Sequence, residues 1–228
     1  MTISPENMPD KILELIKQSW QEFKVDYRNK KIKYYSNEKN PEGFIICWKE
    51  DDIILQLSNY FYKNLKNSEL KDEGIEFHSQ TEISPLKFGE YDFNKNGSLI
   101  ELRKRLPRNP KPDFVITKED DTKTLWLVGE VKYFREWRPL YPDKATHKDR
   151  VDKDLDELTE LKALGICKNT VYLLADSHFH ENNRKKWNTV KERLLKEKKN
   201  RKIDYLNLVI MCDKKNCEEE RIFKFPED

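Results

Sequence analysis

Two β-prone runs separated by a polar segment constrain the fold of this chain more than any other feature. The runs are residues 112–116 and residues 125–132, and both are apolar enough to be central strands of a sheet. Residues 117–123 between them are all charged or hydroxyl-bearing. The arrangement therefore predicts a β-hairpin.

Three charged side chains lie where this hairpin would bring them together. Asp113 opens the first strand, and Glu130 and Lys132 close the second. Because side chains alternate faces along a strand, Glu130 and Lys132 should emerge on one face, where Asp113 can meet them. Charges at the end of a central strand are costly to bury and call for an explanation. The alternative is a Pro-Asp turn beside a solvated strand end.

Two carboxylates beside an ammonium suit the hydrolysis of a phosphodiester bond. Mg²⁺ prefers oxygen ligands and is commonly held by one or two carboxylates together with waters and the substrate phosphate. We expect Asp113 and Glu130 to bind Mg²⁺, with Mn²⁺ as a substitute. Lys132 could then orient or activate the attacking water, or stabilise the transition state as a fixed positive charge.

The residues Pro112-Asp113 and Glu130-Val131-Lys132 resemble the motif of the PD-(D/E)XK nuclease superfamily, which has the restriction-endonuclease-like fold. The resemblance covers about residues 50–212, where the predicted elements run helix, three strands, helix, strand. It implies an α/β fold with a mixed central sheet flanked by helices. It also implies a Mg²⁺-dependent endonuclease acting on DNA, with Asp113, Glu130 and Val131 at the metal.

Supplementary acids are expected from two further elements. Superfamily members often carry an additional glutamate on the leading helix, here predicted at residues 50–66, and Glu50 is best placed for this role among three consecutive acids. The same acids would also suit the helix dipole at the first turn. Glu82 lies in an alternating run at residues 75–83 that predicts the first strand, and it either supplements the site or faces solvent.

Basic residues around this motif are candidates for contacting nucleic acid. The net charge is only +2, so any such surface must come from local clustering. Solvated helix faces or a packed lid are the alternative roles. The candidates are Arg103, Lys104, Arg105, Arg108 and Lys111 before Asp113, Arg135 and Arg138 after Lys132, and Lys148 and Arg150 further along.

Length and composition predict one folded domain with a heavily charged surface. The chain has 228 residues, of which 38% are charged and 36% hydrophobic. Disorder is excluded by 11% aromatic residues and by apolar runs at residues 170–175 and 206–211. Residues 1–45 are expected to form a helical extension, with the helix at residues 10–25, and the core is expected to span about residues 50–212.

The remaining elements follow from periodicity and punctuation. Residues 150–164 carry a buried stripe that ends at Gly165, which predicts the helix after the hairpin. A further helix is predicted at residues 183–199. Residues 84–111 read as a long irregular insertion with a short hairpin around residues 99–102.

Four cysteines without a Cys-x-x-Cys pair predict free thiols. The start of the chain has neither a basic segment nor an apolar one, and no stretch approaches the length of a membrane span. We therefore expect a cytoplasmic protein that does not enter a membrane.

Several alternatives remain open on the sequence alone. The enzyme could act on RNA or on a special nucleic-acid structure, because substrate choice lies in loops and partners. The chain could instead be a non-catalytic nucleic-acid-binding module, or a regulatory subunit in a host-defence or mobile-element system. A homodimer is a candidate assembly, since one site cuts one strand.

Overall fold

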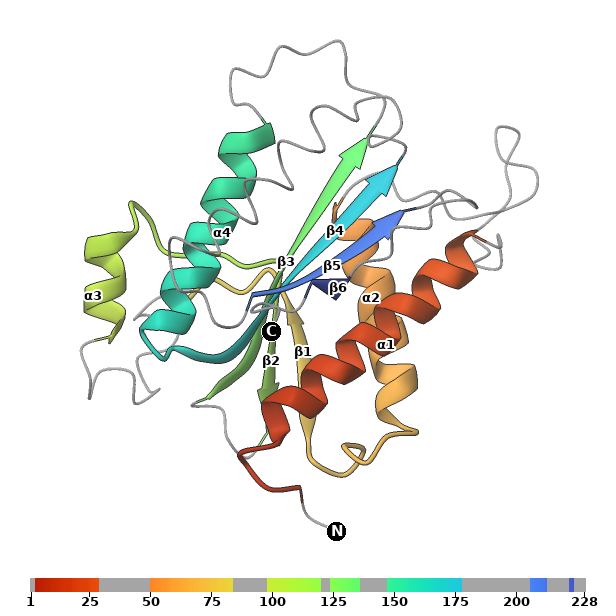
Figure 1. Ribbon diagram of the computed structural model, residues 1–228. Coiled ribbons are helices and arrows are strands. Elements are labelled where there is room, and N and C mark those ends of the chain that lie inside the picture. The colour runs from red at the N-terminus through yellow and green to blue at the C-terminus, as the bar shows by residue number, and fades with distance from the viewer. Residues whose placement is uncertain are drawn as a thin grey trace.

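The computed structural model describes residues 3–28, 50–83, 98–119, 124–135, 147–177, 206–212 and 222–223, and Figure 1 shows their arrangement. In chain order the elements are α1 (Met8–Arg28), α2 (Glu50–Leu65), β1 (Ile75–Ser79), α3 (Ser98–Arg105), β2 (Phe114–Lys118), β3 (Leu125–Arg135), α4 (His147–Ala163), β4 (Cys167–Ser177), β5 (Leu206–Cys212) and β6 (Ile222–Phe223).

A mixed six-stranded sheet forms the centre of the fold, with strand order β1-β2-β3-β4-β5-β6. The first three strands form an antiparallel meander. β4 and β5 then add in parallel to β3, and β6 returns antiparallel. A parallel neighbour cannot be reached by a tight turn, so the chain crosses from β3 to β4 through α4.

Helices cover both faces of the sheet. α1 and α2 pack against each other and against β3, whereas α4 packs on β3 and β4 from the other side with α3 outside it (Figure 1). The predicted α/β class with a mixed sheet flanked by helices is confirmed. The predicted order of helix, three strands, helix and strand is also present in α2, β1 to β3, α4 and β4, with α3 inserted and β5 and β6 added.

Toward the end of β3, side chains alternate between the hydrophobic core and a charged face. Leu127 and Val131 are fully buried in the hydrophobic cluster that α1 and α2 form with the sheet. Glu130 and Lys132 point toward α4, where Asp154 contacts Lys132. The alternation that the sequence predicted for Glu130, Val131 and Lys132 is therefore confirmed, and it separates the core from the charged face.

Two local predictions are wrong. The run at residues 75–83 ends as a strand at Ser79, because Gln80 has a φ of 49° and this left-handed conformation interrupts the extended backbone. The expected hairpin around residues 99–102 is the helix α3 instead. Ser98 and Glu101 have the spacing of a capping box, which favours a helix start. The helix predicted at residues 183–199 lies outside the described residues.

The predictions on thiols and on the membrane have partial answers. Cys167 is buried and carries a free thiol. Within the described ranges, no helix has both the length and the apolar composition needed to cross a bilayer.

Gly129 holds the register between β2 and β3. It lies opposite Phe114, and a Cβ atom at position 129 would stand 2.1 Å from Cζ of the Phe114 ring. That ring is fully buried and stacks on Phe77 with 4.9 Å between ring centroids. Because Phe114 follows Asp113 and Gly129 precedes Glu130, this close packing also sets how the two acids face each other.

We expect Gly129→Ala to destabilise the fold by about 1 to 3 kcal/mol or more, since the buried Phe114 ring must move to admit the methyl group. Urea unfolding would measure the change. Phe114→Leu should relieve part of the cost in the double variant, so the two substitutions should not be additive. A stable Gly129→Ala protein, or strict additivity, would contradict this account of the packing.

Candidate active site

The hairpin brings Asp113 and Glu130 into direct contact. Asp113 lies immediately before β2, and its Oδ2 accepts a hydrogen bond from the main-chain N–H of Val131 at 2.7 Å. Its carboxyl group also forms a hydrogen bond with that of Glu130. The two carboxyl groups are therefore close enough to influence each other's pKa, and Asp113 contributes to the raised pKa of Glu130.

Burial raises the pKa values of both acids. Glu130 is only 6% exposed, and burial raises its pKa well above the usual range, with further increases from Asp113 and Asp154. Burial also raises the pKa of Asp113 to about 6, against the opposing effect of the Val131 N–H. Carboxylates in such a setting are stabilised by any cation that approaches them.

Lys132 is held by carboxylates from two helices. Its Nζ lies 3.0 Å from Oδ2 of Asp154 on α4 and 3.4 Å from Oε1 of Glu50 on α2. Burial alone would lower the pKa of Lys132, but these two carboxylates outweigh it and the pKa is raised. Lys132 is therefore an ammonium at any physiological pH.

Of the three acids at the start of α2, Glu50 is the one that reaches the site. It pairs with Lys132, and its charge also raises the pKa of Asp113. Asp51 instead accepts a hydrogen bond from the Gln80 side chain at 2.5 Å. The sequence could not choose among these acids, because the rotation of the helix about its axis decides which one faces the sheet.

Glu82 has neighbours different from those expected. It lies beyond the end of β1, and its Oε1 accepts a hydrogen bond from Asn109 at 3.0 Å. Glu82 was predicted to reach the site from the first strand. It does not lie on that strand, because β1 ends at Ser79.

Asp154 is a site residue that the sequence analysis did not identify. It is 9% exposed, contacts Lys132, and receives a 3.5 Å hydrogen bond from the hydroxyl of Tyr172 on β4. Its signal in the sequence is weak. Asp154 precedes the buried Leu158 by four residues and Leu161 by seven, so an acid occupies a position on the apolar stripe of the helix.

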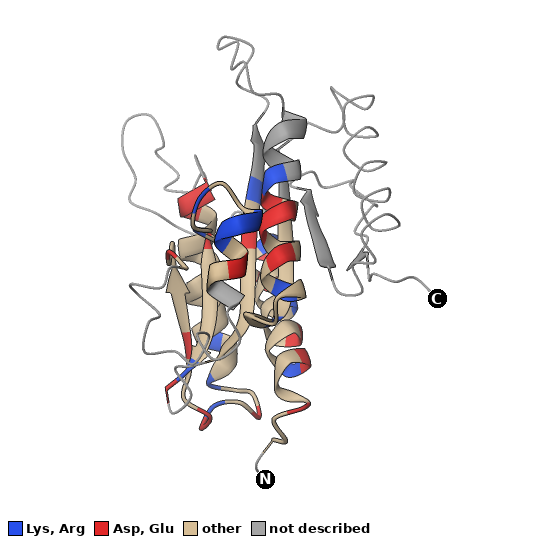
Figure 2. Ribbon diagram, turned by 90° about the vertical axis from the view of Figure 1, so that its left-hand side faces the viewer, with Lys and Arg blue, Asp and Glu red and all other residues tan. Residues whose placement is uncertain are grey.

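The basic run before Asp113 is helical in part, and acids neutralise some of its charges. Arg105 pairs with Glu101 and with Glu160 of α4, and Lys104 also pairs with Glu101. Figure 2 shows Lys and Arg interspersed with Asp and Glu on the side of the molecule where α3 lies. The prediction of an irregular insertion is therefore wrong for residues 98–105, because they form α3, and their role as nucleic-acid contacts stays a prediction.

An ion pair and a hydrogen bond connect the segment between α3 and Asp113 to α4. Arg108 pairs with Glu157 at 3.6 Å, and the main chain of Lys111 donates a hydrogen bond to the same carboxylate. Arg103 donates to Asn109 at 3.3 Å. The side chains of Arg135, Lys148 and Arg150 and the whole of Arg138 lie outside what the structure describes.

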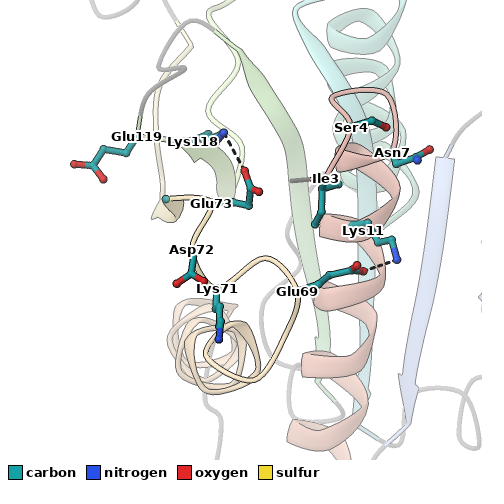
Figure 3. Close-up of a pocket in the computed structure, with 11 residues that line it drawn as sticks. Ile3, Ser4, Asn7, Lys11, Glu69, Lys71, Asp72, Glu73, Lys118 and Glu119 are labelled. Atoms are coloured by element: carbon teal, nitrogen blue, oxygen red, sulfur yellow. Dashed lines mark ion pairs between the residues drawn. The ribbon is translucent and has the colours of Figure 1, made fainter. Parts of the chain in front are cut away.

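A large open cavity of about 1450 Å³ lies at the other end of β2 (Figure 3). Gly74 and Lys118 line it, whereas Asp113 precedes the opposite end of the same strand. Two ion pairs line it, Lys11 with Glu69 and Lys118 with Glu73. The carboxyl groups around Lys132 are the stronger candidate for a functional site, because burial raises the pKa values of Asp113, Glu130 and Asp154 there.

The donor set at Asp113 and Glu130 fits a hard divalent cation. The described part of the chain contains no group of three or more His, Cys, Asp or Glu side chains arranged to hold a metal ion. Mg²⁺ needs only one or two carboxylates when waters and a phosphate complete its shell. Val131 can contribute only its main-chain carbonyl, which points to the same side of β3 as the N–H that binds Asp113.

No protein-family model, curated protein or solved structure matches this chain.

Proposed function

We propose that the protein is a metal-dependent nuclease of the PD-(D/E)XK type that hydrolyses phosphodiester bonds in DNA, with Mg²⁺ as its cation and Mn²⁺ as a substitute. The observation that supports this most is a pair of adjacent, largely buried carboxyl groups, Asp113 and Glu130, with raised pKa values, beside the permanently charged Lys132. Four carboxyl groups, those of Glu50, Asp113, Glu130 and Asp154, gather around this single ammonium, and such an excess of negative charge suits a cation.

The arrangement of elements agrees with this proposal. The resemblance implies a mixed sheet in a core that runs helix, three strands, helix, strand. α2, β1 to β3, α4 and β4 occur here in that order, and the sheet is mixed. Asp113 and the Glu130-Val131-Lys132 segment would then occupy the positions of the superfamily motif.

Each residue has a separate part in the proposed reaction. Asp113, Glu130 and the carbonyl of Val131 would hold the cation. When bound, the cation would neutralise the phosphate and lower the pKa of a water molecule. Lys132 stays protonated, so it would donate hydrogen bonds to the water or to a phosphate oxygen rather than remove a proton.

Exposed cations near the site would contact the phosphate backbone. The side chains of Lys104 and Arg108 are 68% and 61% exposed despite their ion pairs. The exposed Lys104–Glu101 pair contributes little in water and can exchange for a phosphate contact, and the exposed Arg108 guanidinium can contact a phosphate beside its buried partner Glu157. Binding should therefore weaken with salt, without sequence preference from these two residues.

The test is cleavage of plasmid, linear duplex, single-stranded DNA and RNA with Mg²⁺, Mn²⁺ or EDTA. We expect DNA to be cut with either metal and not with EDTA. Plasmid should pass through a nicked form, because one site cuts one strand, unless a homodimer places two sites on opposite strands. Cleavage of RNA alone would show that the substrate is RNA and not DNA. If the protein binds DNA but does not cleave it in the presence of any of these metals, the proposed nuclease activity is wrong and a non-catalytic regulatory module is favoured.

We expect cleavage to depend on pH through the carboxyl pair. The pKa of Asp113 is raised to about 6, and protons and metal compete for the same oxygens, so the rate should rise through about pH 6 and then level. Raising the Mg²⁺ concentration tenfold should move the rising limb to lower pH. If the pH of the rising limb does not depend on the Mg²⁺ concentration, or if the rate falls between pH 6 and 8, the carboxyl pair is not the metal site.

A further inference from the structure

Lys132 has two carboxylate partners, and they are not equivalent. The Asp154 contact is shorter, at 3.0 Å against 3.4 Å for Glu50. The Asp154 side chain is 12% exposed and that of Glu50 is 37% exposed, so water screens the Glu50 contact more strongly. Asp154 is therefore the stronger anchor of the ammonium.

Asp154 is itself fixed in place from two directions. Leu155, Leu158 and Leu161 are buried, so α4 is packed firmly onto the sheet. The hydroxyl of Tyr172 approaches the Oδ2 atom that contacts Lys132, at 3.5 Å. Tyr172 lies beside Glu130 in the parallel register of β3 and β4. The residue that orients Asp154 is therefore a direct neighbour of the candidate metal ligand.

We propose that Asp154, oriented by Tyr172, is a positioning residue that fixes the ammonium of Lys132 beside the Asp113–Glu130 pair. The inference rests on the proposed function and adds to it how the Lys132 ammonium is held in position. A lysine side chain has many rotamers, and a preorganised charge stabilises a transition state only when its position is set before the reaction. Asp154 supplies this constraint without touching the substrate.

The kinetic test uses Asp154→Asn, which keeps the shape and removes the charge. Steady-state cleavage should show kcat lowered by about tenfold or more and KM within about twofold, because the group acts on the reacting charge and not on substrate binding. Asp154→Glu restores the charge on a longer side chain and should recover part of kcat. Unchanged kcat in Asp154→Asn, or a loss confined to KM, would overturn the proposal.

A second readout follows Lys132 directly and needs no cleavage. In metal-free protein, an ammonium held in one place exchanges its protons slowly and gives a sharp ¹H–¹⁵N correlation, which Lys132→Arg would identify by its loss. We expect Asp154→Asn to broaden or remove this signal. Glu157→Gln, which removes another buried carboxylate of α4, should leave it unchanged. A signal that persists in Asp154→Asn would overturn the proposal even if kcat falls.

Tyr172→Phe keeps the test decisive if Asp154→Asn fails to fold. It removes only the hydroxyl that approaches Asp154, so we expect the ammonium signal to broaden and kcat to fall by roughly two- to fivefold. An unchanged signal and unchanged kcat would overturn the role of Tyr172. If the wild type cuts no nucleic acid, the proposed function fails, while the ammonium signal still decides whether Asp154 positions Lys132.

Discussion

Lys132→Met is expected to slow cleavage by about a hundredfold or more while leaving metal binding intact. Removing one preorganised electrostatic contact to a transition state costs on the order of 3 to 4 kcal/mol in barrier height. Methionine has nearly the length of lysine, so the change removes the charge without opening a cavity. Single-turnover cleavage at saturating Mg²⁺ would measure the rate, and the metal-induced rise in melting temperature would report binding.

The variant should also fold, because its neighbours can adjust their protonation. Burial and the nearby acids already raise the pKa of Asp154 to about 6, and without Lys132 this carboxyl group can take up a proton. Asp113→Asn purified in the same way gives the background from contaminating nucleases. Wild-type rates in Lys132→Met above that background would remove Lys132 from the mechanism.

Asp113→Asn and Glu130→Gln are expected to make the metal-free protein more stable at neutral pH. The folded pKa of Asp113 is about 6, against 3.8 for an unperturbed aspartate, so the folded state binds more protons than the unfolded state between about pH 4 and 6. Stability therefore falls as the pH rises through that window. Above it, removing the ionised group should restore on the order of 3 kcal/mol, or roughly 6 to 12 °C in melting temperature.

The same substitutions should abolish stabilisation by metal. For a site with a dissociation constant of about 1 mM, adding about 10 mM Mg²⁺ contributes roughly 1.4 kcal/mol, which corresponds to a shift of about 3 to 6 °C for a domain of this size. Thermal unfolding with and without Mg²⁺ measures both effects. At about pH 4 the metal-free advantage of Asp113→Asn should disappear.

Asp72→Asn is the matched control for these shifts. Asp72 is exposed and lines the open cavity at the far end of β2, away from the carboxyl pair. It should change neither the metal-free melting temperature nor the response to Mg²⁺. Equal metal-induced shifts in the wild type, Asp113→Asn and Glu130→Gln would place the cation elsewhere and leave the hairpin as scaffold.

Local patterns of the sequence predict many elements of the fold. The buried stripes of α1 and α2 and the apolar runs of β2, β3 and β4 follow from side-chain periodicity, which depends only on near neighbours in the chain. The contact of Asp113 with Glu130 was predictable for the same reason. A short hairpin pairs its strands in a register that the turn and the alternation of faces largely determine.

Tertiary packing decided which other charges complete the site. Asp154 arrives on a crossover helix, and no local pattern relates its position to Lys132 on β3. The rotation of α2 selected Glu50, and the left-handed conformation of Gln80 ended β1 before Glu82. The sequence by itself thus determined strands β2, β3 and β4 and the carboxylate pair, because these depend on local periodicity. The partners of Lys132 required the structure, because contacts between distant elements depend on how whole helices pack on the sheet.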